Sequence, residues 1–336
     1  MKPVLNMEDE RWCINKVAHL TKSSIDEAGK IVGKAVEGRE ILKESPDYHT
    51  WFHQRFAPSV VEISFDEYSR TAIDALKILS SVAATDFGSS RQRDFGQLWG
   101  DMTRGYLAES AFQIFLRKHG IDSKLAHEKG KMEDFLESDI PYVKTAKDDS
   151  LREARTKVGI KGTKWNGIWL DIPGDQYSHS DYHVLVKVGV HRDHLFGYFR
   201  SLGFIDRILE EGRGNQALVD PEEISLVSNI VPEFKPISAY ICGFVRNTGP
   251  AMKIQTHGSE IFDGKLARMH YTIHTWKGEF NPGDLKIAAK LGGVTHKDGR
   301  AKFQGIGSFS NTRHTVFNTG SLRWKKSDWK HIFSSI

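Results

Sequence analysis

The chain has 336 residues, of which 39% are hydrophobic and 27% charged, as in ordinary globular proteins with a sizeable core. No apolar run approaches the roughly 18 residues that span a bilayer, and the first residues lack the apolar segment of a signal peptide. The two cysteines, Cys13 and Cys242, are too few for a disulfide framework or a zinc cluster, so we expect a cytoplasmic protein without a membrane partner.

The formal net charge of +4 is unevenly distributed along the chain. From residue 240 to the end there are 15 basic and 6 acidic residues, whereas the remainder has 32 basic and 37 acidic residues. A basic segment of this kind is typical of a surface that binds a polyanion. The C-terminal third is therefore a candidate nucleic-acid surface.

The N-terminal third has a mostly helical pattern. Residues 14–44 are weakly patterned, and Ser64 to Glu67 form a capping-box motif before a helical stretch that reaches about residue 82. A further helix is expected from about 98 to 119, where Gly120 ends it. Glu109 lies on the rim of the apolar face of that helix, where a carboxylate is either solvated or paired with a cation.

After this helix the pattern changes to short strands, expected at 158–160, 167–172 and 182–190. The third strand is apolar almost throughout, which indicates a central strand covered on both faces. Helices are expected near 194–211 and 221–229, and short strands with glycine turns from 239 to about 320. We expect an α/β (α+β) fold with a mixed central sheet flanked by helices. Its expected regions are a helical one at 1–97, a core at 98–235 and a β-rich basic one at 236–336.

Acidic residues precede a lysine in the order that a metal-dependent phosphodiesterase needs. Glu109 on the helix is followed by the acidic segment 133–139 and then by Lys161 in a strand. Mg²⁺ prefers oxygen ligands and keeps positions open for substrate, and a nearby lysine stabilises charge and orients or deprotonates the attacking water. The candidate strand acid is either Asp134 or Asp139. The backbone carbonyl of Ile160 is a further candidate metal ligand, because a ligand at this position does not depend on the side chain.

This order resembles the PD-(D/E)xK nuclease superfamily, in particular the type II restriction endonucleases. The similar core spans about residues 100–200. Residues 105–109 resemble the helix before the site, 133–135 the first acid, 159–161 the (D/E)-x-K element and 180–188 the next core strand. The resemblance implies a restriction-endonuclease-like core that uses Mg²⁺ to cut a specific site in double-stranded DNA. It also implies a homodimer, because a palindromic site mirrors a protein two-fold axis.

The chain departs from the family pattern at Gly159, which stands where the second acid is usual. Three interpretations remain open: Glu109 supplies the acid from the helix, Lys164 is the lysine instead of Lys161, or the site is inactive. In the first interpretation Glu109 points at the end of the strand, and Gly159 leaves room for a ligand from elsewhere. The alternative functions are a repair or structure-selective nuclease and a DNA-binding protein without catalytic activity.

The basic C-terminal region carries the candidate DNA contacts. Lys and Arg neutralise phosphates, and sequence is read by Arg, Lys, Asn and Gln at base edges. The candidates are Arg246, Asn247, Lys253, Gln255, Arg268, Lys302, Gln304, Asn311 and Arg313. Structural roles are expected for Gln176, His179 and Asp181, and a turn-capping role for Asp171.

Overall fold

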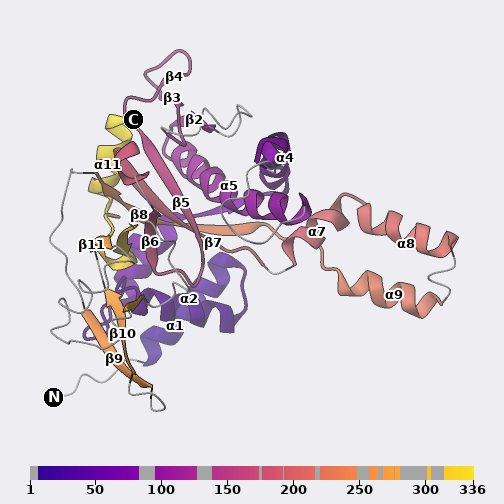
Figure 1. Ribbon diagram of the computed structural model, residues 1–336, viewed down its shortest axis with the longest axis horizontal. Helices are drawn as coiled ribbons and strands as arrows, with labels where there is room; N and C mark the ends of the chain where they lie inside the picture. Colours follow the sequence, from indigo (N-terminus) through magenta and orange to yellow (C-terminus); the bar gives the residue numbers. More distant parts are fainter. Residues whose placement is uncertain are drawn as a thin grey trace.

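The computed structural model describes residues 7–82, 95–126, 138–173, 176–191, 193–215, 220–247, 257–263, 268–275, 277–280, 301–303 and 314–336. Its centre is a four-stranded sheet in the order β1-β8-β7-β5 (Figure 1). These strands are β1 (Val60–Ile63), β8 (Ile237–Arg246), β7 (Tyr182–Val188) and β5 (Val158–Lys164). β5 runs parallel to β7, whereas β8 is antiparallel to both β7 and β1. This mixed sheet between helices confirms the expected α/β fold class.

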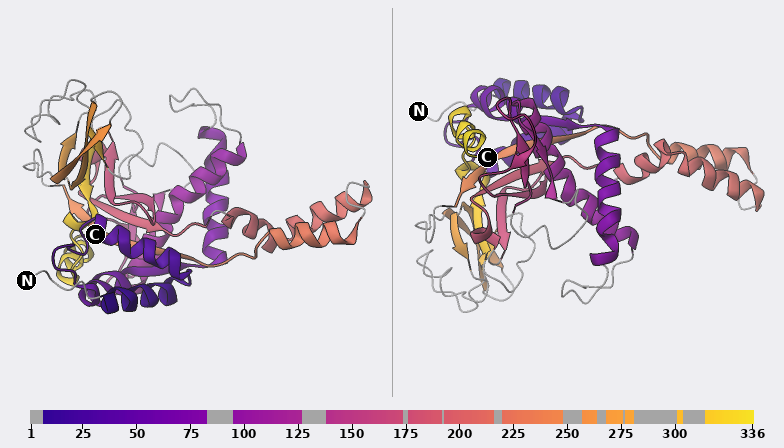
Figure 2. Two further views of the ribbon diagram at one scale, coloured as in Figure 1. Left: turned by 90° about the horizontal axis from the view of Figure 1, so that it is seen from below. Right: turned by 90° about the horizontal axis from the view of Figure 1, so that it is seen from above.

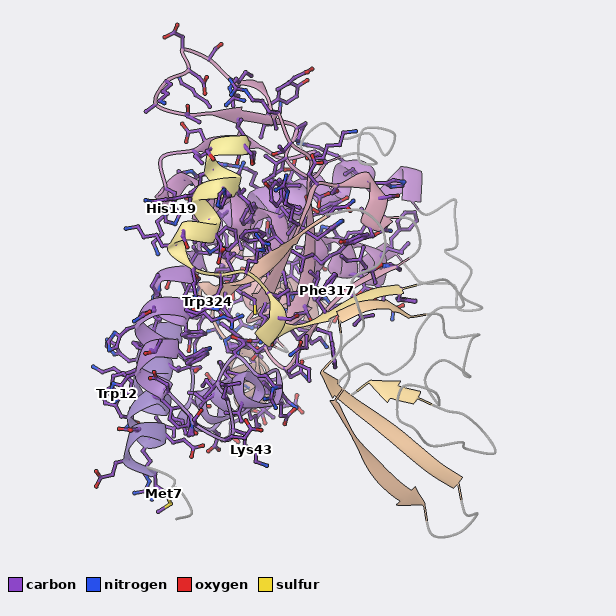
Figure 3. The ribbon with its side chains drawn as sticks, turned by 90° about the vertical axis from the view of Figure 1, so that its left-hand side faces the viewer. Met7, Trp12, Lys43, His119, Phe317 and Trp324 are labelled. Carbon is purple, nitrogen blue, oxygen red and sulfur yellow. The ribbon has the colours of Figure 1, made fainter. Side chains whose placement is uncertain are left out.

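One face of the sheet is covered by α4 (Phe65–Val82), α5 (Phe95–Lys118) and the C-terminal helix α11 (Lys326–Ser335). The predicted capping box is present at the start of α4, where the backbone N–H of Ser64 donates to Glu67 Oε2 at 2.9 Å. The prediction that Gly120 stops α5 is also confirmed, since this glycine has a φ of +77°. Figure 3 shows α11 beside His119, whose ring lies 4.8 Å from that of Phe333.

The opposite face is covered by N-terminal elements: α1 (Met7–Thr21), α2 (Ile25–Glu37), α3 (Tyr48–Thr50), the π-helical turn η1 (Trp51–Phe56) and the 3₁₀ turn η2 (Ala57–Ser59). All seven residues of β7 are buried as a result. The expectation of a central strand covered on both faces is therefore confirmed.

Smaller sheets surround this core. β6 (Trp169–Pro173) and β11 (Lys277–Phe280) pair with β13 (His314–Asn318), β2 (Asp122–Lys124) and β4 (Arg152–Glu153) pair with β3 (Tyr142–Lys144), and β9 (His257–Asp263) and β12 (Ala301–Phe303) pair with β10 (Arg268–Thr275). The short elements α6 (Gln176–His179) and η5 (Thr319–Ser321) precede β7 and α11. The central sheet takes β1 from the expected N-terminal region and β8 from the expected C-terminal region, so it crosses both predicted boundaries.

Between β7 and β8 the chain leaves the sheet as a helical arm. It contains α7 (His194–Ser201), α8 (Phe204–Gly214) and α9 (Pro221–Ile230), and α8 and α9 project together away from the body in both views of Figure 2. The single helix predicted over 194–211 is split in two because Gly203 adopts a φ of +72°. Among the helices of the described ranges, none combines the length and apolarity needed to cross a bilayer.

Candidate active site

Helix α5 lies directly on β5 because glycine occupies the point of closest approach. A Cβ built on Gly162 would lie only 2.8 Å from the Cβ of Ala108. Val158 and Ile160 join the same apolar cluster as α5. Side chains alternate between the faces of a strand, so Gly159 and Lys161 belong to the other face. The side chain of Ile160 therefore faces α5, and that of Lys161 lies on the opposite face of the sheet.

Asp139 lies on the free edge of β5. Its backbone N–H donates to the carbonyl of Val158 at 2.9 Å, and its carboxylate Oδ2 accepts from the backbone N–H of Ile160 at 2.5 Å. The N–H and C=O of a strand residue point to the same side of the strand, so the Ile160 carbonyl faces this edge too. The structure thus places one candidate acid beside the backbone group expected to share the metal.

The negative charges of Glu109 and Asp139 both influence the pKa of Tyr106. Burial raises the pKa of Tyr106, and the charges of Glu109, Asp139 and Asp74 raise it further. The helix acid and the edge acid therefore both lie near one partly buried phenol on α5. Sequence reasoning missed Tyr106, although its spacing of three residues before Glu109 places the two on the same face of a helix.

Lys161 lies on the opposite face of β5 from Glu109. Its ammonium donates to Oε1 of Gln176 in α6 at 2.6 Å, and its positive charge also reaches His183. Glu109 and Asp139 therefore share Tyr106 as an electrostatic neighbour, whereas Lys161 lies on the other face of β5. A structural role was expected for Gln176, but it contacts the head of a candidate site residue instead.

The space above Gly159 is already filled. A Cβ at this position would lie 3.0 Å from Ser180 Oγ and 3.1 Å from His183 Nδ1. The expectation that Gly159 leaves room for a ligand from elsewhere is therefore wrong on this face. Burial lowers the pKa of His183 to about 4. The hydrogen bond between its Nε2 and the Tyr177 carbonyl, at 3.0 Å, has the opposite but smaller effect. That bond makes Nε2 the donor, so a neutral imidazole presents the lone pair of Nδ1 to the glycine.

The other expected site residues are more scattered. Lys164 is exposed at the end of β5, and Asp134 lies outside the described residues. The carboxylate of Asp181 accepts from the backbone N–H of Lys157 at 2.8 Å, which is a structural role as expected. The turn-capping role expected for Asp171 is wrong, because this residue lies within β6 and its Oδ1 is 2.7 Å from Nδ1 of His314. His314 was not predicted, since 143 residues separate the pair.

The residues expected to contact DNA are also scattered over the structure. Arg246 is exposed at the end of β8, where it is free of the core. Asn247 donates its side-chain amide to the carbonyls of Tyr177 at 2.9 Å and Ser180 at 3.3 Å, so its amide hydrogens already serve the fold. Arg268 begins β10 and Lys302 lies within β12. The remaining candidates, Lys253, Gln255, Gln304, Asn311 and Arg313, lie outside the described residues.

The candidate oxygen ligands at the free edge of β5 and on helix α5 fit magnesium in kind. Glu109 and Asp139 offer carboxylate oxygens and Ile160 offers a carbonyl oxygen, and Mg²⁺ prefers such hard ligands. Within the described ranges no three His, Cys, Asp or Glu side chains converge as a complete metal cluster. The edge therefore supplies part of an oxygen-ligand set, with the backbone as one member.

No protein-family model, curated protein or solved structure matches this chain. The function therefore has to be argued from the chemistry of its own residues.

Proposed function

We propose that the protein is a sequence-specific, Mg²⁺-dependent endonuclease of double-stranded DNA that acts in the cytoplasm in the manner of type II restriction enzymes. One observation carries the proposal. The carboxylate of Asp139 accepts from the backbone N–H of Ile160, the residue immediately before Lys161. An acid therefore lies beside the backbone of the residue that precedes the candidate lysine, which supports a hydrolytic site at this strand.

Each residue has a distinct role in this proposal. Asp139, Glu109 and the Ile160 carbonyl would hold the metal, which when bound supplies charge stabilisation and a more acidic water. Lys161 offsets negative charge on the phosphate, and Gln176 orients its ammonium. Tyr106 stays protonated at neutral pH because its pKa is raised, so it can donate a hydrogen bond to a carboxylate.

The test is cleavage of plasmid DNA in Mg²⁺ and in EDTA. We expect discrete fragments in Mg²⁺, none in EDTA, and a rate at least about a hundredfold lower for Lys161→Ala, since removing one charge-stabilising donor has an effect of this size. Lys147→Ala changes an exposed turn lysine and serves as the matched control. Fragments from branched DNA but not from intact duplex would favour a repair or structure-selective nuclease. Unchanged cleavage by both Lys161→Ala and Glu109→Ala would exclude the assigned site.

A DNA-binding protein without hydrolytic activity is the second candidate function. Two observations favour it: Ser180 and His183 occupy the space that an acid at position 159 needs, and β5 separates Glu109 from Lys161. In this case the protein retards duplex DNA in a gel-shift assay but leaves it intact with Mg²⁺. Methylated and unmethylated substrates are compared in the same assay.

We further propose that the helical arm pairs with a second copy of the chain. Ile205 and Leu209 are buried, but four large apolar side chains on α8 and α9 are about half exposed or more. These are Phe204, Ile208, Leu226 and Ile230. Two such arms related by a two-fold axis would form a four-helix bundle and bury these side chains. A two-fold dimer also matches cleavage of both strands.

We expect the wild-type protein to have twice the mass of one chain in light scattering. The double variant Ile208→Glu/Leu226→Glu would then have the mass of one chain, because charges cannot be buried unpaired in the bundle. Ile73→Glu, on α4 and 51% exposed, is the control that should remain dimeric. A monomeric wild-type protein, or a dimeric double variant, would contradict the assignment of this interface.

A further inference from the structure

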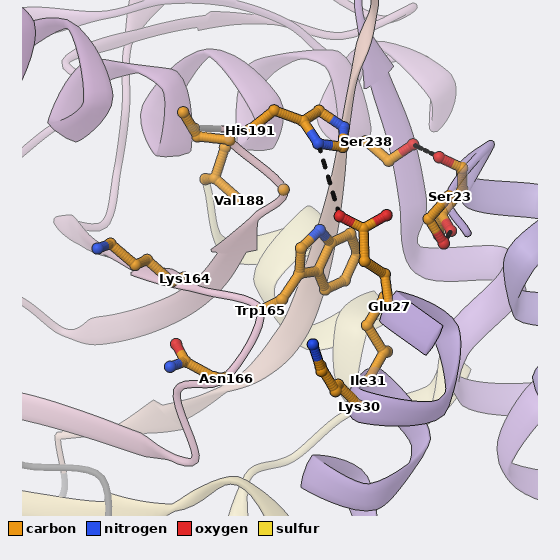
Figure 4. A pocket seen from close by; sticks show the side chains of 13 residues that line it. Ser23, Glu27, Lys30, Ile31, Lys164, Trp165, Asn166, Val188, His191 and Ser238 are labelled. Atoms are coloured by element: carbon orange, nitrogen blue, oxygen red, sulfur yellow. Dashed lines mark hydrogen bonds and ion pairs between the residues drawn. The ribbon is translucent and has the colours of Figure 1, made fainter. Parts of the chain in front are cut away.

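A separate pocket opens at the C-terminal ends of the parallel strands β5 and β7. Its volume is 320 Å³, and it lies between the turn at 164–166, the segment 188–191 and the start of α2 (Figure 4). Ile160 and Lys164 are four residues apart in one strand, so the pocket lies about 13 Å along β5 from the edge that carries Asp139. Crevices outside the carboxyl ends of parallel strands are common ligand sites in α/β proteins.

The pocket is rich in hydrogen-bond donors that have no partner among the described residues. Lys30 and Lys164 each contribute an exposed ammonium, Asn166 an exposed amide and Trp165 an indole N–H. None of these four side chains forms a hydrogen bond or an ion pair with the described part of the chain. Donors without partners at one concave site favour a ligand with several acceptor atoms.

The charges of the pocket favour an anion. Its one carboxylate, Glu27, is already engaged: it accepts from the backbone and hydroxyl of Ser24 in the capping box of α2, and it lies 3.8 Å from His191. The Ser24 bonds and the positive charge of His191 lower the pKa of Glu27. Lys30 also contributes to this lowering, so two lysines and one carboxylate leave the lining with a net charge of +1.

Trp165 gives the pocket a fixed aromatic wall. A Cβ built on Gly189 would lie 2.0 Å from the indole nitrogen, so only a glycine there lets the ring sit against the backbone. Phe56 holds the other part of the indole, with the ring centroids 6.2 Å apart. An aromatic ring held in place beside free ammonium groups is the combination that proteins use to stack a base and neutralise its phosphate.

We propose that this pocket binds a single nucleotide. The base stacks on Trp165, the amide of Asn166 bonds to the base edge, and the phosphate lies between Lys30 and Lys164. A volume of 320 Å³ is at the lower end of the range for small-molecule sites, which suits one nucleotide. The ligand is either a free nucleotide or one nucleotide turned out of a DNA strand. The inference does not rest on cleavage, because none of these residues lies at the Asp139 edge.

The test is isothermal titration calorimetry at low salt with four deoxynucleoside 5′-monophosphates, a deoxynucleoside and inorganic phosphate. We expect at least one monophosphate to bind at least tenfold more tightly than either the nucleoside or phosphate. Lys30→Ala should weaken that binding about tenfold, and Asn166→Ala should reduce the differences among the four bases. Both side chains are exposed, so the variants should fold. Lys16→Ala, an exposed lysine on α1, is the matched control.

A second arm identifies the source of the nucleotide. A short duplex with one unpaired nucleotide is compared with the fully paired duplex and with the best monophosphate, using wild-type protein and Lys30→Ala. A Lys30-dependent preference for the unpaired site assigns the pocket to DNA, and a preference for the monophosphate assigns it to a free nucleotide. Both results support the proposal. It is overturned if no monophosphate binds at millimolar concentration, or if Lys30→Ala and Asn166→Ala both bind like the wild type.

Discussion

Asp139→Asn should greatly slow Mg²⁺-dependent cleavage and leave the fold intact. The amide oxygen of asparagine can still accept from the backbone N–H of Ile160, so the contact that seats this residue on β5 survives. The variant loses only the negative charge. A metal supplies several kcal/mol of charge stabilisation in such reactions, and each 1.36 kcal/mol corresponds to a factor of ten in rate. We therefore expect a loss of about a thousandfold.

The measurement is the rate of conversion of supercoiled plasmid to linear DNA, together with a thermal unfolding curve for each variant. Asp122→Asn is the matched control, because it removes an exposed carboxylate from β2, in the small sheet next to Asp139. It should cleave at the wild-type rate. If Asp139→Asn cleaved as fast as the control, the strand acid would have to be Asp134 or the proposed site would fail.

The sequence predicted those features of the fold that depend only on residues close together in the chain. The capping box at Ser64 and the positive φ at Gly120 depend on a few neighbouring residues, and both were predictable. Gly203 gave the same kind of signal, yet it lies inside an otherwise continuous helical pattern. The place of β8 was not predictable, because its pairing with β1 joins residues that lie far apart in the sequence. Such pairing is decided by packing of the whole domain.

The candidate site shows the same division. The order of Glu109, Asp139 and Lys161 was read from the sequence, and the structure places Asp139 against the strand of that lysine. Successive side chains of any strand point to opposite faces, so the sequence also predicts that Ile160 and Lys161 lie on opposite faces of β5. Which of the two faces α5 covers is a tertiary fact, and it follows from the contact of Gly162 with Ala108. The position of Glu109 and Lys161 on opposite faces of β5 could therefore not be predicted from the sequence.

A buried ionic network joins the N-terminal region to the central sheet. The Glu40 carboxylate accepts from the Lys187 ammonium at 2.8 Å, the Tyr240 hydroxyl at 2.8 Å and the Trp51 indole N–H at 3.1 Å. Nε of Arg55 lies 3.7 Å away. The side chains of Glu40, Lys187 and Arg55 are at most 4% exposed. Two buried cations thus depend on one carboxylate.

The pH dependence of this network has a definite sign. Burial alone would raise the pKa of Glu40, but the charges of Lys187 and Arg55 lower it to about 2. The pKa of glutamate in an unfolded chain is about 4.3. A carboxylate whose pKa is lowered by folding stabilises the native state above the unfolded pKa, and that contribution is lost as the pH falls toward the folded pKa. The network should therefore weaken between about pH 4.5 and pH 2.

Glu40→Ala should lower the free energy of unfolding by about 3–5 kcal/mol at neutral pH, because it leaves Lys187 and Arg55 buried without their counter-charge. Urea unfolding followed by circular dichroism measures this change. Glu37→Ala removes a partly exposed carboxylate that pairs with Lys34, and such a pair contributes at most about 1 kcal/mol. Glu40→Gln keeps the shape but cannot titrate, so its stability should fall less steeply than that of the wild type between pH 4.5 and pH 2. Equal losses for Glu40→Ala and Glu37→Ala would show that the buried carboxylate does not hold the two regions together.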